Sequence, residues 1–161
     1  MAITLLIILL ILTSSVSVLC GVGVILTIIS RLIPAQKAFE GGTLPEGLEG
    51  FYQGRLAGLS LPWRGKFFNK ESGLNRFHVF GQRDLFEFKI SQGPGLTDPT
   101  VTVLKIDYNI PENPFWLRLI LDELVQIGPD NYLGKAHLRL ISSLPFTVVY
   151  FRLSKQLYRK G

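Results

Sequence analysis

The first 30 residues of the chain carry no charged side chain, and only hydroxyl groups, one cysteine and two glycines interrupt the apolar run from residue 3 to residue 29. A helix rises about 1.5 Å per residue, so this run reaches about 40 Å and exceeds the hydrocarbon core of a bilayer, which is about 30 Å thick. The sequence therefore predicts a single transmembrane helix, and we expect residues 1–32 to form a membrane anchor.

A cleaved export signal explains this run less well. Such signals have a basic start and an apolar stretch of about 7 to 15 residues, whereas this run is longer and follows only Met1 and Ala2. Lipidation of Cys20 is also disfavoured, because the bulky Leu19 precedes it and more apolar residues follow. We expect the anchor to be retained.

Small side chains recur every four residues within the anchor, at Thr13, Ser17 and Gly21. This spacing places them on one helical face, and small faces allow helices to approach closely in lipid. The pattern predicts a surface that packs against transmembrane helices of a larger membrane complex. The alternative is that glycine, serine and threonine are simply common in spanning helices.

The charges that flank the run predict its orientation. No basic residue precedes it, whereas Arg31 and Lys37 follow, so the C-terminal part is expected on the cytoplasmic, stromal or matrix side with the N-terminus outside. All charged side chains, with a formal net charge of +5, lie after residue 30, and this balance suits contact with anionic membrane lipid. We expect no nucleic-acid partner, because no run of basic residues and no binding motif is present.

Residues 33–50 are rich in glycine and proline in their second half and predict a linker, which leaves residues 51–161 for one extramembrane domain. That domain is predicted to be mainly β. Residues 84–91 alternate strictly between apolar and polar, and residues 100–108, 131–141 and 146–154 behave similarly, with turn residues between these runs. The fold class expected is a small antiparallel β-barrel or meander after one transmembrane helix.

Residues 115–127 are ambiguous. Their polar side chains gather on one helical face between Pro114 and Gly128, which favours a helix, whereas the neighbouring strands favour continuation of a sheet. We expect a strand in the second half and leave open a short helix near 114–127.

Four short blocks follow one another in an order that resembles small lipocalin-like domains of the GXWXG type: Gly50-Phe51-Tyr52-x-Gly54, Trp63-Arg64-Gly65-Lys66-x-Phe68, Asp122-Glu123 before Tyr132-Leu133-Gly134, and Tyr150-Phe151-x-Leu153. The first block lacks the tryptophan between its glycines. The resemblance spans roughly residues 50–155 and implies a compact antiparallel barrel. It also implies an interior that holds an apolar ligand.

No arrangement of residues predicts catalysis, and we expect neither a catalytic site nor a metal nor a cofactor. The segment around Gly65-Lys66 lacks the glycine and the hydroxyl residue of a phosphate-binding loop, and the two histidines, His78 and His137, have no ligand partners at metal-binding spacing. His137 is expected at the surface. Asp122 and Glu123 are adjacent, so a strand would turn them to opposite faces, where pairing with Arg118 or Arg139 is expected.

Two functions remain as hypotheses. The first is a non-catalytic accessory subunit of a larger membrane complex, of respiratory or photosynthetic type, with the β domain packed on its partner at the membrane surface. The second is a membrane-tethered lipocalin-like module that binds a lipid, isoprenoid or pigment. For the second hypothesis, the aromatic and aliphatic side chains of the predicted strands supply the candidates for the barrel lining: Phe67, Phe86, Phe88, Leu104, Ile106 and Tyr108.

Overall fold

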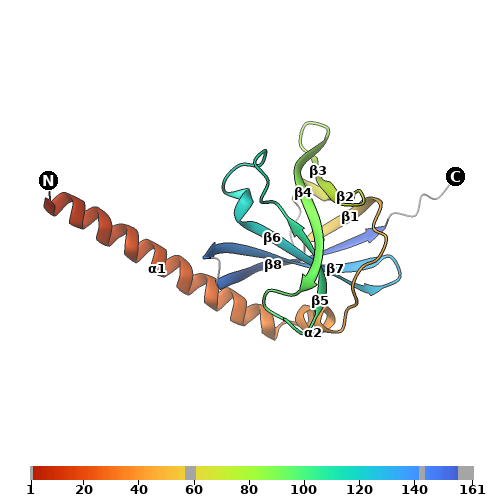
Figure 1. The fold of residues 1–161 in the computed structure, drawn as a ribbon, viewed down its shortest axis with the longest axis horizontal. Helices are drawn as coiled ribbons and strands as arrows, with labels where there is room; N and C mark the ends of the chain where they lie inside the picture. Colours follow the sequence, from red (N-terminus) through yellow and green to blue (C-terminus); the bar gives the residue numbers. More distant parts are fainter. Residues whose placement is uncertain (1, 57–60, 142–143, 156–161) are drawn as a thin grey trace.

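The structure is a computed structural model, and it describes residues 2–56, 61–141 and 144–155. Within these residues a long helix is followed by a short helix and a β-barrel (Figure 1). The elements are α1 (Ala2–Leu32), α2 (Pro34–Glu40), β1 (Gly50–Leu56), β2 (Trp63–Phe68), β3 (Ser72–His78), β4 (Gln82–Pro94), β5 (Thr102–Asp107), the 3-10 helix η1 (Leu117–Leu119), β6 (Ile120–Gly128), β7 (Asn131–Ile141) and β8 (Leu144–Lys155).

The described strands β1 to β8 pair antiparallel in sequence order, and β8 returns to pair with β1. The sheet is therefore a closed barrel without a free edge, which removes the unpaired backbone groups that promote aggregation. The predicted fold class is confirmed: the chain is mainly β, with one N-terminal helix that is long and apolar enough to span a membrane.

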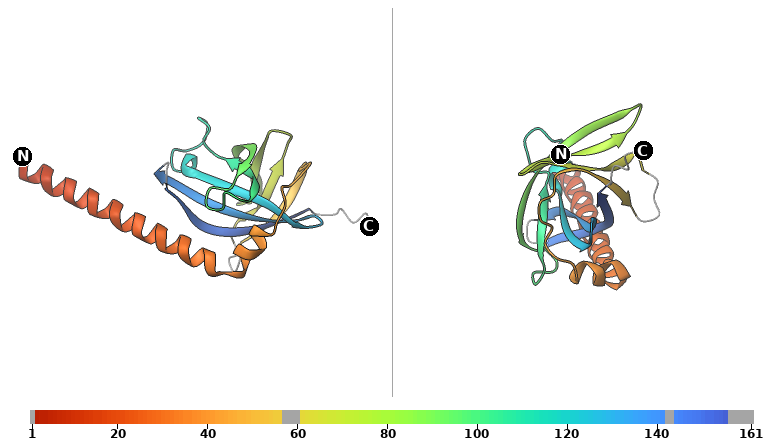
Figure 2. Two further views of the ribbon diagram at one scale, coloured as in Figure 1. Left: turned by 60° about the horizontal axis from the view of Figure 1, so that its bottom comes forward. Right: turned by 90° about the vertical axis from the view of Figure 1, so that its right-hand side faces the viewer.

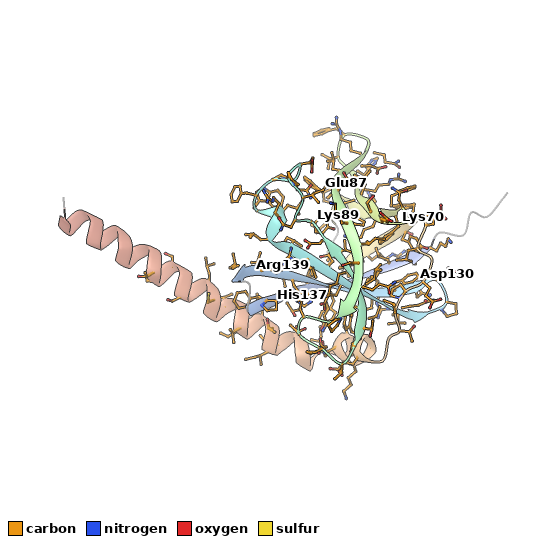
Figure 3. All side chains as sticks on the ribbon, viewed as in Figure 1. Lys70, Glu87, Lys89, Asp130, His137 and Arg139 are labelled. Carbon is orange, nitrogen blue, oxygen red and sulfur yellow. The ribbon has the colours of Figure 1, made fainter. Side chains whose placement is uncertain are left out.

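Strand alternation sorts the side chains of the barrel as the sequence pattern predicts in β4 and β5. Phe88, Leu104 and Ile106 lie in the interior core, while Glu87 and Lys89 are exposed on the outer face. Figure 3 shows the last two side chains on β4. At Phe86 the register of β4 against β3 shifts, and the backbone has a positive φ of 59°. This bulge turns the Phe86 carbonyl towards the barrel interior, where it accepts a hydrogen bond from Asn75.

The ambiguous segment 115–127 divides into two parts. A single turn of 3-10 helix, Leu117–Leu119, precedes strand β6. The strand expected in the second half is confirmed. Pairing with β5 and β7 on both sides overrides the local helical pattern, because it supplies hydrogen bonds and burial that an isolated helix would not.

The segment predicted as a linker is ordered against the barrel. Pro34 starts α2, and the buried side chains of Gln36 and Phe39 pack on the outer face of the barrel. Farther along, Leu44 and Leu48 pack against the interior core at the end of the barrel that carries the β2–β3 turn. Residues 33–50 therefore connect α1 to the barrel and pack against it through Gln36, Phe39, Leu44 and Leu48.

The C-terminal third of helix α1 contacts the outer face of β8. A Cβ atom at Gly23 would lie 2.6 Å from the Phe146 ring, so the glycine allows the helix to approach the strand closely. Farther along, the Thr147 amide donates a hydrogen bond to the Thr27 hydroxyl at 3.0 Å. Tyr150 reaches the Ser30 carbonyl at 3.4 Å. The helix therefore runs in the same direction as β8, and its N-terminal part extends beyond the barrel (Figures 1 and 2).

Candidate functional site

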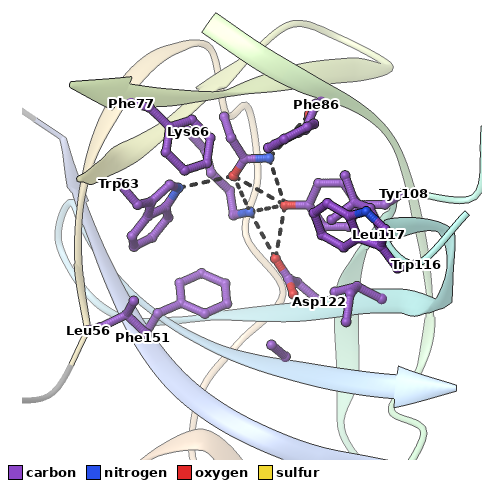
Figure 4. A pocket seen from close by; sticks show the side chains of 13 residues that line it. Leu56, Trp63, Lys66, Phe77, Phe86, Tyr108, Trp116, Leu117, Asp122 and Phe151 are labelled. Atoms are coloured by element: carbon purple, nitrogen blue, oxygen red, sulfur yellow. Dashed lines mark hydrogen bonds and ion pairs between the residues drawn. The ribbon is translucent and has the colours of Figure 1, made fainter. Parts of the chain in front are cut away.

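A cavity of about 310 Å³ opens at one end of the barrel. We call this the mouth end: it is the end at which β1, β3, β5 and β7 finish and β2, β4, β6 and β8 begin. The walls are largely apolar, and the side chains that line the cavity come from strands around the barrel and from η1 (Figure 4): Leu56, Trp63, Lys66, Asn75, Phe77, Phe86, Tyr108, Trp116, Leu117, Ile120, Asp122, Ala136 and Phe151. Both the size and the apolar character are typical of a small-molecule site.

Four polar side chains form a connected group at the inner end of this cavity, which we call the polar floor: Lys66, Asn75, Tyr108 and Asp122. Lys66 is 2% exposed, and its ammonium Nζ donates to Asp122 Oδ2 at 2.8 Å and to Asn75 Oδ1 at 3.0 Å. It also contacts the Tyr108 hydroxyl. The Tyr108 hydroxyl in turn lies 3.2 Å from Asp122 Oδ2 (Figure 4).

The barrel holds this group from several strands at once. Lys66 lies on β2, Asn75 on β3 and Asp122 on β6, while Tyr108 directly follows β5. Trp63 at the start of β2 donates its indole N–H to Asn75 Oδ1 at 3.1 Å. A buried charge is costly unless it is paired and hydrogen-bonded, and here the cation meets both conditions.

Burial sets the ionisation behaviour of the polar floor. Removal from water lowers the pKa of Lys66, although the charge of Asp122 and its hydrogen bond oppose this effect. Burial also raises the pKa of Tyr108 well above its ordinary value, and the negative charge of Asp122 adds to that shift. At neutral pH the tyrosine is consequently a neutral hydroxyl that can donate or accept a hydrogen bond.

Chemically, the site offers hydrogen-bonding groups without net charge, because the lysine cation and the aspartate anion offset each other. Aromatic rings surround the cation: Lys66 Nζ lies 5.0 Å from the ring centre of Tyr108 and 5.2 Å from that of Phe88. Such a floor beneath apolar walls fits a molecule with an apolar body and one small neutral polar group.

The predicted lining residues separate into three groups in the structure. Phe86 and Tyr108 line the cavity. Phe88, Leu104 and Ile106 fill the interior beyond the polar floor. Phe67 points to the outer face of β2, where its ring lies 5.8 Å from the Arg76 guanidinium. The assignment of Phe67 to the barrel lining is therefore wrong, because alternation places its neighbours Lys66 and Phe68 inside.

The polar floor itself was missed by the sequence patterns. Lys66 and Asp122 are separated by 56 residues and meet only when the barrel closes. Asp122 and Glu123 do point to opposite faces of their strand, as predicted, but their partners are not Arg118 and Arg139. The one available signal was the strand sequence Lys66-Phe67-Phe68, in which alternation places Lys66 on the same face as Phe68, so an inward Phe68 brings the lysine inward as well.

A second group of buried polar side chains lies on the outer face of the barrel beneath the helices and the β4–β5 loop. Glu123 Oε2 lies 3.0 Å from His137 Nε2, and both side chains are fully buried. Glu123 Oε1 also accepts the Leu96 amide of the loop at 2.5 Å. The expectation that His137 lies at the surface is wrong: the residue points outward from the barrel (Figure 3) but is fully buried. Its ring lies between Glu123 and Thr147, and the Thr147 amide is bonded to Thr27 of α1.

The small residues of α1 lie away from the barrel. Thr13, Ser17 and Gly21 are exposed, and the Ser17 hydroxyl donates to the carbonyl of Thr13 within the same helix at 2.9 Å. A Cβ atom on Gly21 would meet nothing within 4 Å. The part of α1 that contacts the barrel starts at Gly23 instead.

Within the described residues, no group of three or more histidine, cysteine, aspartate or glutamate side chains is arranged to hold a metal ion. The window Thr13–Ser30 of α1 is the stretch of described chain that meets the length and composition needed to cross a membrane. Comparisons of the chain with protein-family models, with curated proteins and with solved structures give no match.

Proposed function

We propose that this protein is a membrane-anchored binding module whose barrel holds an apolar small molecule bearing one neutral polar group, such as a hydroxyl or a carbonyl. The observation that carries the proposal is the cavity itself, in which apolar walls end at the hydrogen-bonded Lys66, Tyr108 and Asp122. The first part of α1 supplies the membrane anchor. The resemblance to lipocalin-like domains agrees with such a function.

Two features favour binding over a solid structural barrel. Aromatic and aliphatic side chains densely fill the interior beyond the polar floor. The cavity at the mouth end is therefore a gap confined to that end, and it does not reflect loose packing throughout the barrel. Trp63, Trp116 and Phe86 also present ring faces and edges around the space, as ligand sites commonly do.

The direct test uses the full chain in detergent micelles. Organic extracts of the purified protein are analysed by mass spectrometry, and 1-aminoanthracene is titrated as a fluorescent apolar probe. We expect saturable binding of the probe with one site, together with a change in the emission of the tryptophans that line the cavity. Absence of any copurifying apolar molecule together with non-saturable probe binding would overturn the proposal.

A matched pair of variants locates the binding. Ala136→Phe introduces a ring into the cavity, whereas Ser91→Phe introduces the same ring on the exposed outer face of β4. We expect the first variant to lose most of the saturable binding and the second to retain it. Circular dichroism and thermal unfolding of both variants distinguish a blocked cavity from an unfolded barrel.

The accessory-subunit hypothesis stays a prediction. The exposed face of α1 that contains Thr13, Ser17 and Gly21 is the surface through which a transmembrane partner would dock. Native electrophoresis of mildly solubilised membranes tests it, since migration of the protein alone would contradict membership of a stable complex.

A further inference from the structure

We infer that the mouth end of the barrel is a membrane-docking surface, seated in the headgroup region of the same bilayer that α1 spans. The inference names a lipid bilayer as the partner of this surface. It rests on the proposed membrane anchor but not on the presence of a ligand in the cavity.

The first observation is the direction of α1. Its contacts with β8 progress from Gly23 at Phe146, near the mouth end, to Ser30 at Tyr150, deeper along the barrel. The helix before Gly23 therefore projects past the mouth end, as Figures 1 and 2 show. This projecting part contains about 20 residues, and its length of about 30 Å matches the hydrocarbon core.

The second observation is the absence of a spacer. The helix is continuous from Ala2 to Leu32, so no flexible segment separates its projecting part from the part packed on the barrel. Apolar side chains remain exposed down to the level of the barrel at Ile25, Ile28 and Ile29. A span placed in the bilayer consequently brings the barrel against the membrane surface, with the mouth end foremost.

The third observation is the composition of the mouth end itself. The β3–β4 turn exposes Phe80 completely, and the β5–β6 connection exposes Phe115 and Trp116 by 79% and 50%. Burying such rings in water-excluding lipid is favourable, and aromatic side chains prefer the membrane interface. Because these residues lie on connections far apart in the sequence but at the same end of the barrel, they form a rim around the cavity.

Exposed basic side chains flank this apolar rim. Arg83 follows the turn that carries Phe80, and Arg118, in η1, is two residues after Trp116. Aromatic side chains next to arginines suit a boundary where acyl chains meet anionic headgroups. An apolar ligand would then pass between the lipid phase and the cavity without crossing bulk water.

The test measures depth in the membrane with an environment-sensitive fluorophore on single cysteines. In a Cys20→Ser background, the cysteine is placed on the rim by Phe80→Cys or Phe115→Cys, and at the opposite end of the barrel by Lys70→Cys or Pro129→Cys, which are exposed positions. Val18→Cys reports the anchor. Each full-length variant is reconstituted without ligand into phosphatidylcholine and phosphatidylglycerol vesicles that contain doxyl-labelled lipid.

We expect both rim labels to lose most of their emission to the doxyl lipid and to resist quenching by aqueous iodide. The labels at positions 70 and 129 should show the reverse. The inference would be overturned if iodide quenched the rim labels as readily as the label at position 70. The label at position 18 must be quenched by lipid in the same experiment, which shows that the anchor is inserted. A protein partner covering the rim is a distinct outcome that also overturns the inference, because the rim labels would then resist both quenchers.

This experiment separates the inference from the proposed function. Docking is measured on ligand-free protein, so it can be confirmed even where the cavity binds no probe. Conversely, probe binding in detergent can succeed where docking fails.

Discussion

At the scale of single residues, the Lys66–Asp122 pair determines the character of the cavity. Removing one partner of a buried ion pair leaves an uncompensated charge, whereas replacing both by apolar groups is often neutral. We therefore expect Lys66→Met to lower the free energy of unfolding by about 3–5 kcal/mol. The double variant Lys66→Met with Asp122→Leu should recover most of this loss. Chemical denaturation of the wild type, both single variants and the double variant measures the coupling.

The same set of variants separates stability from binding. If the polar floor positions the polar group of a ligand, the double variant binds 1-aminoanthracene but loses selectivity for molecules that carry a hydroxyl or carbonyl group. A double variant as unstable as the single variants would show that Lys66 stabilises the barrel through its other partners, Asn75 and Tyr108.

At the scale of elements, the closest contact between the anchor and the barrel depends on Gly23. A larger side chain there must displace the Phe146 ring, whereas the same side chain at Gly21 meets open space. We expect Gly23→Leu to weaken the attachment of α1 by about 1–3 kcal/mol, the usual cost of overpacking. Gly21→Leu serves as the control in the same helix. Trypsin cleavage after the exposed Lys37 should accelerate in the first variant only, and equal rates in the two variants would contradict the role of Gly23.

The β4–β5 loop is attached to β7 through an ion pair that responds to pH. Burial alone would raise the pKa of Asp98, but hydrogen bonds and the charge of Lys135 outweigh it, so the pKa is lowered overall. A carboxyl group with a lowered pKa in the folded state stabilises that state above its unfolded pKa of about 3.9. This contribution is lost as the pH falls through the folded pKa.

We therefore expect the loop to detach in acid before the barrel unfolds. Hydrogen exchange of the Leu96 amide, which is bonded to Glu123, reports the detachment. Asp98→Asn should remove most of the pH dependence of the protection factor of this amide, that is, of its exchange rate relative to the intrinsic rate at each pH, between about pH 5 and pH 2. Unchanged pH dependence of the protection in that variant would contradict the role of Asp98.

At the scale of the whole molecule, the prediction that remains to be measured is the side of the membrane on which the barrel lies. Arg31 and Lys37 follow the span and no basic residue precedes it, which predicts a cytoplasmic, stromal or matrix barrel. Trypsin should then digest the barrel in inverted membrane vesicles and spare it in vesicles of native orientation. Digestion in the native orientation only would reverse the assignment.

Much of the architecture was predictable because it depends on local pattern. The uncharged run gives the long helix, and period-two alternation gives the faces of β4 and β5. The opposite orientation of Asp122 and Glu123 follows from strand geometry alone. These features need only the spacing of neighbouring residues, so the sequence by itself determined them.

The site depended on tertiary structure, because it is built from register and closure. His137 points outward from the barrel and is nevertheless fully buried, which strand alternation alone does not predict. Lys66 and Asp122 meet only across the closed barrel. The direction of α1 relative to the mouth end likewise follows from packing on β8. No local spacing encodes which distant strands become neighbours, so the sequence determined a membrane helix and a set of strands, while the folded barrel determined the cavity and where it opens.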